Sequence, residues 1–87
     1  MKKIQKVQVK NQQGLHTRPA TAIVKMLQKT KSTVYFTHKK ERVNAKSILS
    51  LLMLAASKNA KITIEIEGED AEATMEKLLL AFETEFD

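Results

Sequence analysis

The chain has 87 residues, of which 43% are hydrophobic and 29% charged, with a formal net charge of +5 and no cysteine. We expect one globular domain over residues 1–87, and the composition excludes a disulfide framework and a thiolate metal site. The basic first residues lack the apolar run of a signal peptide and no apolar stretch could span a membrane, so we expect a cytoplasmic protein without membrane insertion.

The first two elements are a strand and a helix. Val7 and Val9 alternate with polar residues, which predicts a half-buried strand, and Ile4 is out of phase with them, so this strand is expected to carry a bulge or to start late. A helix is predicted from Thr17 to about Lys29. Its apolar stripe consists of Ala20, Ile23, Val24 and Leu27.

A hairpin and a short helix follow. Residues 33–38 and 41–45 read as two strands joined around Lys39-Lys40, a pair that lacks the usual glycine or asparagine of a tight turn. Ser47 is predicted to open a helix that runs to about Leu54. Asn59 is expected to terminate this helix in a left-handed conformation.

The last two elements are the clearest strand of the chain and a final helix. Residues 61–67 alternate strictly between isoleucine and polar residues, which predicts one buried and one exposed face. Gly68 breaks this strand, and Asp70 is expected to cap the helix that follows. The apolar face of that helix consists of Ala71, Met75, Leu78, Leu79, Phe82 and Phe86.

The resulting order is βαββαβα. The right-handed crossover rule makes the first two strands parallel and leaves room for the fourth strand between them. We therefore expect an α+β fold, an open-faced β-sandwich whose four-stranded antiparallel sheet has the order 1-4-2-3 and carries three helices on one face.

One short segment, Gly14-Leu15-His16-Thr17-Arg18-Pro19-Ala20, combines residues suited to holding an anion. Gly14 permits a turn, and Pro19 is tolerated in the first turn of a helix, so His16 falls at or near the N-cap. Helix N-termini bind phosphate through free backbone N–H groups, and Arg18 adds a guanidinium that matches phosphate oxygens. An imidazole nitrogen in such a place can accept a phosphoryl group as a nucleophile.

This segment resembles the active-site signature of HPr, the histidine phosphocarrier family of the bacterial phosphotransferase system. A second segment, Ala45-Lys46-Ser47-Ile48, resembles the regulatory serine motif of that family. The length, the spacing of the two motifs and the later Gly68-Glu69-Asp70 are also similar, and the family has the same open-faced sandwich.

The resemblance implies a phosphocarrier rather than a turnover enzyme. His16 would accept a phosphoryl group on Nδ1 from enzyme I, which phosphoenolpyruvate charges, and pass it to a histidine of enzyme IIA acceptors. Arg18 and the N–H groups of Thr17 and Arg18 would hold the phosphate. The sequence contains no paired carboxylates, nucleotide-binding glycine loop or metal-ligand spacing, so we expect no cofactor and no metal. We also expect a monomer.

Ser47 and the helix after it are candidates for regulation and docking. By residue type Ser47 is an N-cap, and the resemblance implies that an HPr kinase/phosphorylase phosphorylates it in some bacteria. A helix so rich in apolar residues should expose some of them, which is typical of a docking site. The expected contact residues for enzyme I and the acceptors are Thr17, Ile48, Leu49, Leu52 and Met53, with Lys25 and Lys46 steering acidic partners.

Other basic and aromatic residues refine this picture. Lysines expected to flank the His16 region are Lys10, Lys25, Lys29 and Lys46. The aromatic residues lie in no RNA-recognition signature, so acidic proteins are favoured over nucleic acid as partners. His38 lacks an Arg-Pro context, and we interpret it as solvent-exposed and not a phosphoryl acceptor.

Two alternatives stay open. HPr-like proteins often carry glycine where this chain has Ala55 and Asn59, and an Asn-Gly-like turn where it has Lys39-Lys40. The run 51–54 and the ending 82–87 are more similar to the nitrogen-regulatory branch, whereas Lys46-Ser47 is more similar to the sugar branch. A non-carrier regulator controlled at Ser47 is the second alternative.

Overall fold

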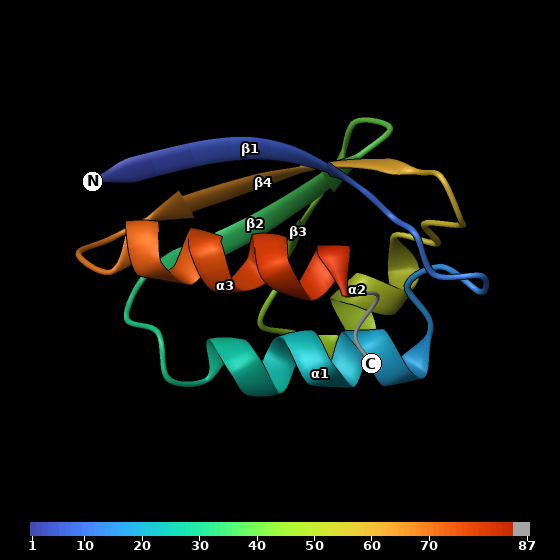
Figure 1. Cartoon of the computed structure of the whole chain (residues 1–87), viewed down its shortest axis with the longest axis horizontal. Coiled ribbons are helices and arrows are strands. Elements are labelled where there is room, and N and C mark those ends of the chain that lie inside the picture. Colours follow the sequence, from blue (N-terminus) through green and yellow to red (C-terminus); the bar gives the residue numbers. More distant parts are fainter. Residues whose placement is uncertain (85–87) are drawn as a thin grey trace.

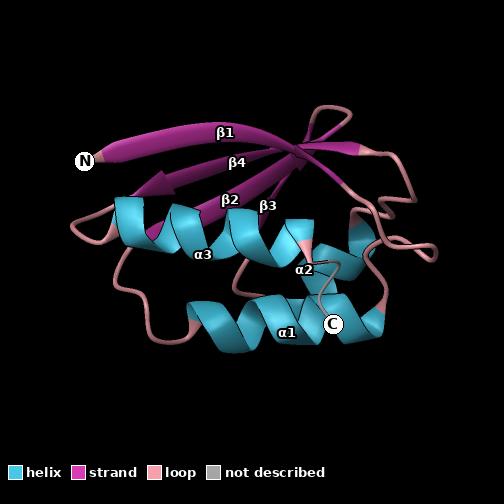
Figure 2. Cartoon of the chain, viewed as in Figure 1, coloured by secondary structure: helices cyan, strands magenta, loops and turns pink. Residues whose placement is uncertain are grey.

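The computed structural model describes residues 1–84, and within them it has the predicted order of strands and helices. The sheet has the order β1-β4-β2-β3, with every neighbouring pair antiparallel. All the helices lie on one side of it (Figures 1 and 2). The expected open-faced sandwich is thereby confirmed. The elements are β1 (Lys2–Gln8), α1 (Thr17–Leu27), β2 (Thr33–His38), β3 (Glu41–Asn44), α2 (Ile48–Met53), β4 (Lys61–Glu67) and α3 (Ala71–Glu83).

The central strand β4 shows why the sheet has two different faces. Ile62, Ile64 and Ile66 have no exposed surface and pack under the helices, as their alternation predicts. The pairing of β1 with β4 runs without interruption from Lys2 opposite Glu67 to Gln8 opposite Lys61. The expectation of a bulge or a late start in β1 is therefore wrong.

Ile4 explains the broken alternation of β1. It lies opposite Glu65, on the face away from the helices, and 60% of its surface is exposed. Since a β-strand tolerates a single apolar residue on its solvent face, the out-of-phase residue changes the surface and not the backbone. The first strand is regular.

Charged side chains cover the rest of this outer face. The Glu65 carboxylate lies 3.1 Å from the Lys2 ammonium and 3.4 Å from the Arg42 guanidinium, and Arg42 also stacks 3.8 Å from the centre of the Tyr35 ring. The hydrogen bond from Lys2, followed by the charges of Lys2 and Arg42, lowers the pKa of Glu65. Because Arg42 covers Tyr35, the open sheet offers no free aromatic ring there for stacking on a base.

Helix α1 buries Pro19, Ala20, Ile23 and Leu27, most of the predicted stripe, whereas Val24 is half-buried. The helix ends at Leu27, two residues before the predicted end. In the same core, the ring centres of Phe36 and Phe82 lie 5.9 Å apart.

Asp70 occupies the N-cap position of α3, but its carboxylate does not cap the helix. It accepts hydrogen bonds from the Ser32 hydroxyl and from the Lys31 backbone N–H, the latter at 3.0 Å. These bonds, that of Ser32 first, hold the pKa of Asp70 well below its usual range. Instead of capping α3, Asp70 links the start of α3 to the α1–β2 loop by hydrogen bonds. Phe86, predicted on the apolar face, lies outside the described residues.

Among residues 1–84, four residues other than glycine have positive φ: Lys39 (49°), Lys40 (71°), Ala55 (51°) and Asn59 (74°). They are the positions where HPr-like proteins, which the sequence resembles, often carry glycine or an Asn-Gly turn, and here the left-handed conformation is adopted without those residues. His38 pairs with Glu41, which leaves Lys39-Lys40 as the two-residue turn, and positive φ at both residues is what a type I′ turn needs.

The end of α2 differs from the sequence expectation. Its C-cap is Leu54, and the left-handed residue directly beyond the cap is Ala55. Asn59 is left-handed too, but it belongs to the next turn, where its N–H donates to the Val9 carbonyl at 2.7 Å. Ala55 therefore terminates α2, in the position that glycine commonly takes. Within residues 1–84, no helix is both long and apolar enough for a membrane span.

Candidate functional site

The conformation of the loop before α1 places His16. Gly14 has a φ of 69°, and a β-carbon there would overlap the Ala56 carbonyl oxygen. The Leu15 N–H donates to that same oxygen at 2.9 Å, and the His16 N–H donates to the Gly14 carbonyl at 3.0 Å. Only glycine allows this close approach of the two loops. The first residue of the sequence motif is thus a glycine because the backbone conformation and the contact with Ala56 require one.

His16 is the N-cap of α1, as predicted, with extended backbone angles. Its carbonyl accepts the N–H of Ala20 at 3.0 Å, whereas its side chain makes no capping hydrogen bond. The first-turn N–H groups of Thr17 and Arg18 have no intrahelical acceptor, and Pro19 has no N–H at all. The half-buried imidazole therefore lies beside free donors and the positive end of the helix dipole.

A polar cavity of about 490 Å³ surrounds this end of α1. It takes residues from the β1–α1 loop, from α1 itself and from the loop before β4. The residues that line it are Lys10, Asn11, Gln12, Gln13, His16, Arg18 and Lys58. Among the described residues no carboxylate borders it, so the charge around the His16 ring is positive. Such a hollow is suited to an anion.

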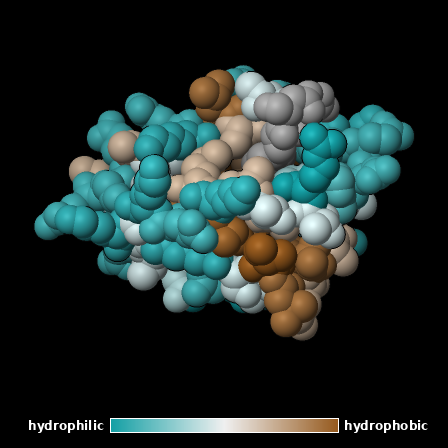
Figure 3. Space-filling model, turned by 90° about the horizontal axis from the view of Figure 1, so that it is seen from below, coloured by the Kyte–Doolittle hydropathy of each residue, from teal (hydrophilic) through white to brown (hydrophobic). Residues whose placement is uncertain are grey.

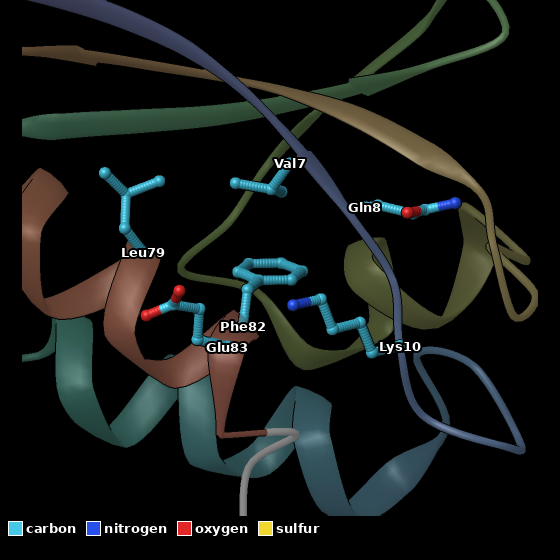
Figure 4. A pocket seen from close by; sticks show the side chains of 6 residues that line it. All are labelled: Val7, Gln8, Lys10, Leu79, Phe82 and Glu83. Carbon is cyan, nitrogen blue, oxygen red and sulfur yellow. The ribbon is translucent and has the colours of Figure 1, made fainter.

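Lys10 borders this cavity but also a second hollow of about 370 Å³ between β1 and the end of α3. Val7, Leu79 and Phe82 form the apolar part of the second hollow. Figure 4 shows the Lys10 side chain extending into it, with the amino group directed toward the Phe82 ring. Lys10 thus lies near the His16 region, as expected, while its ammonium faces α3.

The remaining predicted basic residues lie toward the opposite end of α1. Lys25 belongs to the last turn of that 11-residue helix, and Lys29 follows its end. Lys46 donates from its ammonium to the Thr30 carbonyl at 3.3 Å. Since an 11-residue helix is about 16 Å long, the expectation that Lys25, Lys29 and Lys46 flank His16 is wrong.

Ser47 is the N-cap of α2, as predicted, and its hydroxyl oxygen accepts the Ser50 N–H at 3.2 Å. The helix after it divides its apolar residues between core and surface. Leu51 is fully buried and Leu52 half-buried, whereas Leu49 and Met53 are 67% and 72% exposed and Ile48 is 38% exposed. Figure 3 shows an apolar patch on the face seen from below.

His38 is half-buried rather than exposed, and its Nδ1 lies 3.3 Å from the carbonyl oxygen of Lys61, the first residue of β4. Among residues 1–84, no group of three or more histidine, cysteine or acidic side chains could hold a metal ion. Of His16 and His38, the predicted acceptor His16 is the one that lies beside free backbone N–H groups at the start of a helix.

Sequence reasoning missed four residues of the cavity wall, Asn11, Gln12, Gln13 and Lys58, and of these Lys58 is the charged one. Its ammonium donates to the Gln12 side-chain oxygen at 3.2 Å, across a separation of 46 positions. The residues around Lys58 form no motif, and nothing local connects it with His16. Only the pairing of the two loops in space could have indicated it.

Comparison with known proteins identifies this arrangement. Residues 3–84 match the family model described as the PTS HPr component phosphorylation site. The chain is 41% identical over 78 residues to the phosphocarrier protein HPr of Chlamydia muridarum, covering 90% of this chain and 75% of that protein.

Solved structures agree with the family match. An HPr from Thermoanaerobacter tengcongensis superimposes with a TM-score of 0.93 at 32% identity, covering 97% of this chain and 94% of that one. The catabolite-repression protein Crh of Bacillus subtilis, whose crystal structure is described as a dimer with a swapped domain, has a TM-score of 0.74 at 38% identity, covering 94% and 93% of the two chains.

Proposed function

This chain belongs to the HPr family and is a phosphocarrier of the phosphotransferase system, and we propose that His16 is the residue that carries the phosphoryl group. The observation behind this proposal is the position of His16. Its side chain makes no capping hydrogen bond, and it lines the polar cavity at the N-terminus of α1. His38, the other histidine, has its Nδ1 beside a backbone carbonyl instead.

In the proposed step, the lone pair of His16 Nδ1 attacks the phosphorus atom of phosphorylated enzyme I. A nitrogen–phosphorus bond forms on His16 while the bond from phosphorus to the donor atom breaks, and its electron pair stays on the donor. The reverse sequence, with a histidine of an enzyme IIA acceptor as the nucleophile, discharges the carrier. The phosphohistidine is an intermediate, no cofactor or metal is needed, and the chain has no turnover reaction of its own.

Arg18 and the N–H groups of Thr17 and Arg18 stabilise the phosphoryl oxygens during both transfers. Arg18 is exposed and lines the cavity, and the positive end of the helix dipole also favours an anion there. A carrier must release its load, so binding much tighter than the transition state would slow onward transfer. An open helix end supports reversible transfer.

The exposed residues of α2, together with Thr17, form the proposed docking surface for enzyme I and the acceptors. Ile48, Leu49 and Met53 supply an exposed apolar area, and Lys25 supplies a positive charge for acidic partners. Leu52 is half-buried and packs against the core, so it contributes less exposed area to this surface. Lys46 remains a candidate for steering, although its ammonium is bound to the Thr30 carbonyl.

Regulation at Ser47 fits the same surface. A phosphate on this N-cap would place about two negative charges beside Ile48 and Leu49. It would weaken any partner that buries those residues. We therefore propose Ser47 as a site for an HPr kinase/phosphorylase, separate from the carrier chemistry of His16.

The carrier role is tested by intact mass after incubation with phosphoenolpyruvate and enzyme I, before and after brief acid treatment. We expect one acid-labile phosphoryl group on the native chain and on His38→Ala, and none on His16→Ala. Retained labelling of His16→Ala would overturn the assignment. No labelling of the native chain by an enzyme I that is competent on another HPr would favour the non-carrier regulator at Ser47.

The pathway branch and the oligomeric state need separate measurements. Transfer rates from the phosphorylated chain to sugar-type and nitrogen-type acceptor domains would distinguish the two branches. We propose a monomer, and sedimentation equilibrium would test it against the dimer described for Crh.

A further inference from the structure

Backbone hydrogen bonds hold the loop that carries Lys58 against the loop that carries His16. The Val9 N–H donates to the Ala60 carbonyl at 2.8 Å, and the Asn59 N–H donates back to the Val9 carbonyl at 2.7 Å. On the other side of Lys58, the Ala56 carbonyl accepts the Leu15 N–H at 2.9 Å. Lys58 is therefore bracketed by bonds on both sides, and its backbone position relative to His16 is set by the fold.

The Lys58 side chain is also positioned. Its ammonium donates to the Gln12 side-chain oxygen at 3.2 Å, and both residues line the polar cavity with His16 and Arg18. Gln12 is a neutral acceptor, so it orients the ammonium without cancelling its charge. One N–H of the three is used by this bond, which leaves two donors for another acceptor.

The cavity thus has cations from two different elements. Arg18 comes from the first turn of α1, and Lys58 comes from the loop before β4. Lys10 borders the cavity as well, but its ammonium is directed into the hollow beside Phe82 (Figure 4). Lys58 is therefore the lysine whose ammonium is bound to a residue of the cavity wall.

We propose that Lys58 is a phosphate-binding residue of this carrier, donating a charge-assisted hydrogen bond to the phosphoryl group once it is on His16. Gln12 acts as its positioning residue. This inference rests on the proposed role of His16 and adds a third source of donors to Arg18 and the backbone N–H groups. A lysine on an exposed loop favours the phosphorylated form moderately, which suits a group that must be passed on.

The test compares Lys58→Gln with Lys58→Arg, Gln12→Met and Lys6→Gln. Lys6→Gln removes the same charge from an exposed residue of β1 that pairs with Thr63, on the side of the sheet away from the helices. Each variant is equilibrated with a limiting amount of phosphorylated enzyme I, and the phosphorylated fraction is measured by intact mass. The pKa of the phosphoryl group is measured by phosphorus NMR.

We expect Lys58→Gln to lower the equilibrium constant for phosphorylation about twofold to fivefold, since exposed ion pairs contribute up to about that much. It should also raise the pKa of the phosphoryl group, because the dianion loses a cation. Lys58→Arg should restore both values and Lys6→Gln should change neither. Gln12→Met should have an intermediate effect in the native background and none in the Lys58→Gln background.

These outcomes separate the two proposals. If His16→Ala is still phosphorylated, the proposed function fails. If His16→Ala is inert but Lys58→Gln keeps the native equilibrium and phosphoryl pKa, the assignment of Lys58 alone fails. An equal change in Lys6→Gln would also overturn it, because the effect would then follow net charge rather than position.

Discussion

The two ends of α1 differ in whether the polar groups near them already have partners. At the N-terminal end, the Thr17 and Arg18 N–H groups have no intrahelical acceptor. The polar cavity that His16 and Arg18 line there has, among the described residues, no carboxylate on its wall. Toward the C-terminal end, the Thr30 carbonyl accepts the Lys46 ammonium, and Asp70 binds the loop at Lys31 and Ser32.

Saturated polar groups stabilise a fold, whereas free donors are available to a ligand. The loop that follows α1 is satisfied by side chains from elsewhere in the chain, so it contributes to stability. The N-terminal end keeps its donors free, so it can bind and release an anion. Changes near the C-terminal end of α1 should therefore affect the free energy of unfolding, and changes at its N-terminal end should affect phosphoryl transfer.

The largest effect is expected from Arg18→Ala. Loss of a donor to the transferring phosphoryl group should lower the rate of phosphorylation by enzyme I about a hundredfold. The free energy of unfolding should stay close to the native value, because Arg18 is exposed. Quenched-flow mixing with detection by mass spectrometry measures the rate of phosphorylation, and urea unfolding measures the stability. A variant with a native rate but a lower stability would contradict the comparison.

Asp70→Asn should show the reverse pattern, with lower stability and native phosphorylation. The Asp70 carboxylate is stabilised by the Ser32 and Lys31 donors, so its pKa is lower in the folded chain than in the unfolded one. Its contribution is full above the ordinary aspartate pKa of about 4 and is lost as the pH falls below that value.

The difference in unfolding free energy between the native chain and Asp70→Asn should therefore shrink as the pH is lowered from 7 toward 2.5. Urea unfolding at a series of pH values measures it. A difference that is constant across this range would mean that the negative charge of Asp70 does not stabilise its hydrogen bonds to Lys31 and Ser32.

Ala55→Gly tests the loop that brings Lys58 to the open end. Ala55 has a φ of 51°, a conformation that costs a residue with a β-carbon about 1 kcal/mol relative to glycine. We expect a gain of about 1 kcal/mol in unfolding free energy. Ala56→Gly, at a residue whose φ is not positive, is the control and should destabilise. Loss of stability in Ala55→Gly would show that flexibility of the unfolded chain dominates.

The smallest effect is expected from Lys46→Met. Removing a cation from the C-terminal end of a helix costs about 0.3–1 kcal/mol, and the salt dependence of stability should fall with it. Phosphorylation of His16 by enzyme I should change little if Lys46 serves only this end of α1. A tenfold slower transfer at low salt, with unchanged stability, would instead support the steering role proposed for Lys46.

Much of the fold follows from local patterns. The strict alternation of 61–67 and the stripe along α1 depend on neighbouring residues only, and the observed strand and helix start where the patterns predict. The first strand was harder, because a single exposed Ile4 breaks the alternation without breaking the strand. Asp70 was assigned to the correct position but to the wrong bond, since Ser32 is 38 positions away in the sequence.

The sequence by itself determined the order of the elements, the N-cap position of His16 and the free donors of its helix, because each depends on residues within a few positions. Only the tertiary structure decided which cations share the cavity with His16. The pairing of residues 9–15 with residues 56–60 brings Lys58 to the site, and the length of α1 carries Lys25 and Lys46 away from it. Charge acts through distance in space, and that distance is set by long-range packing.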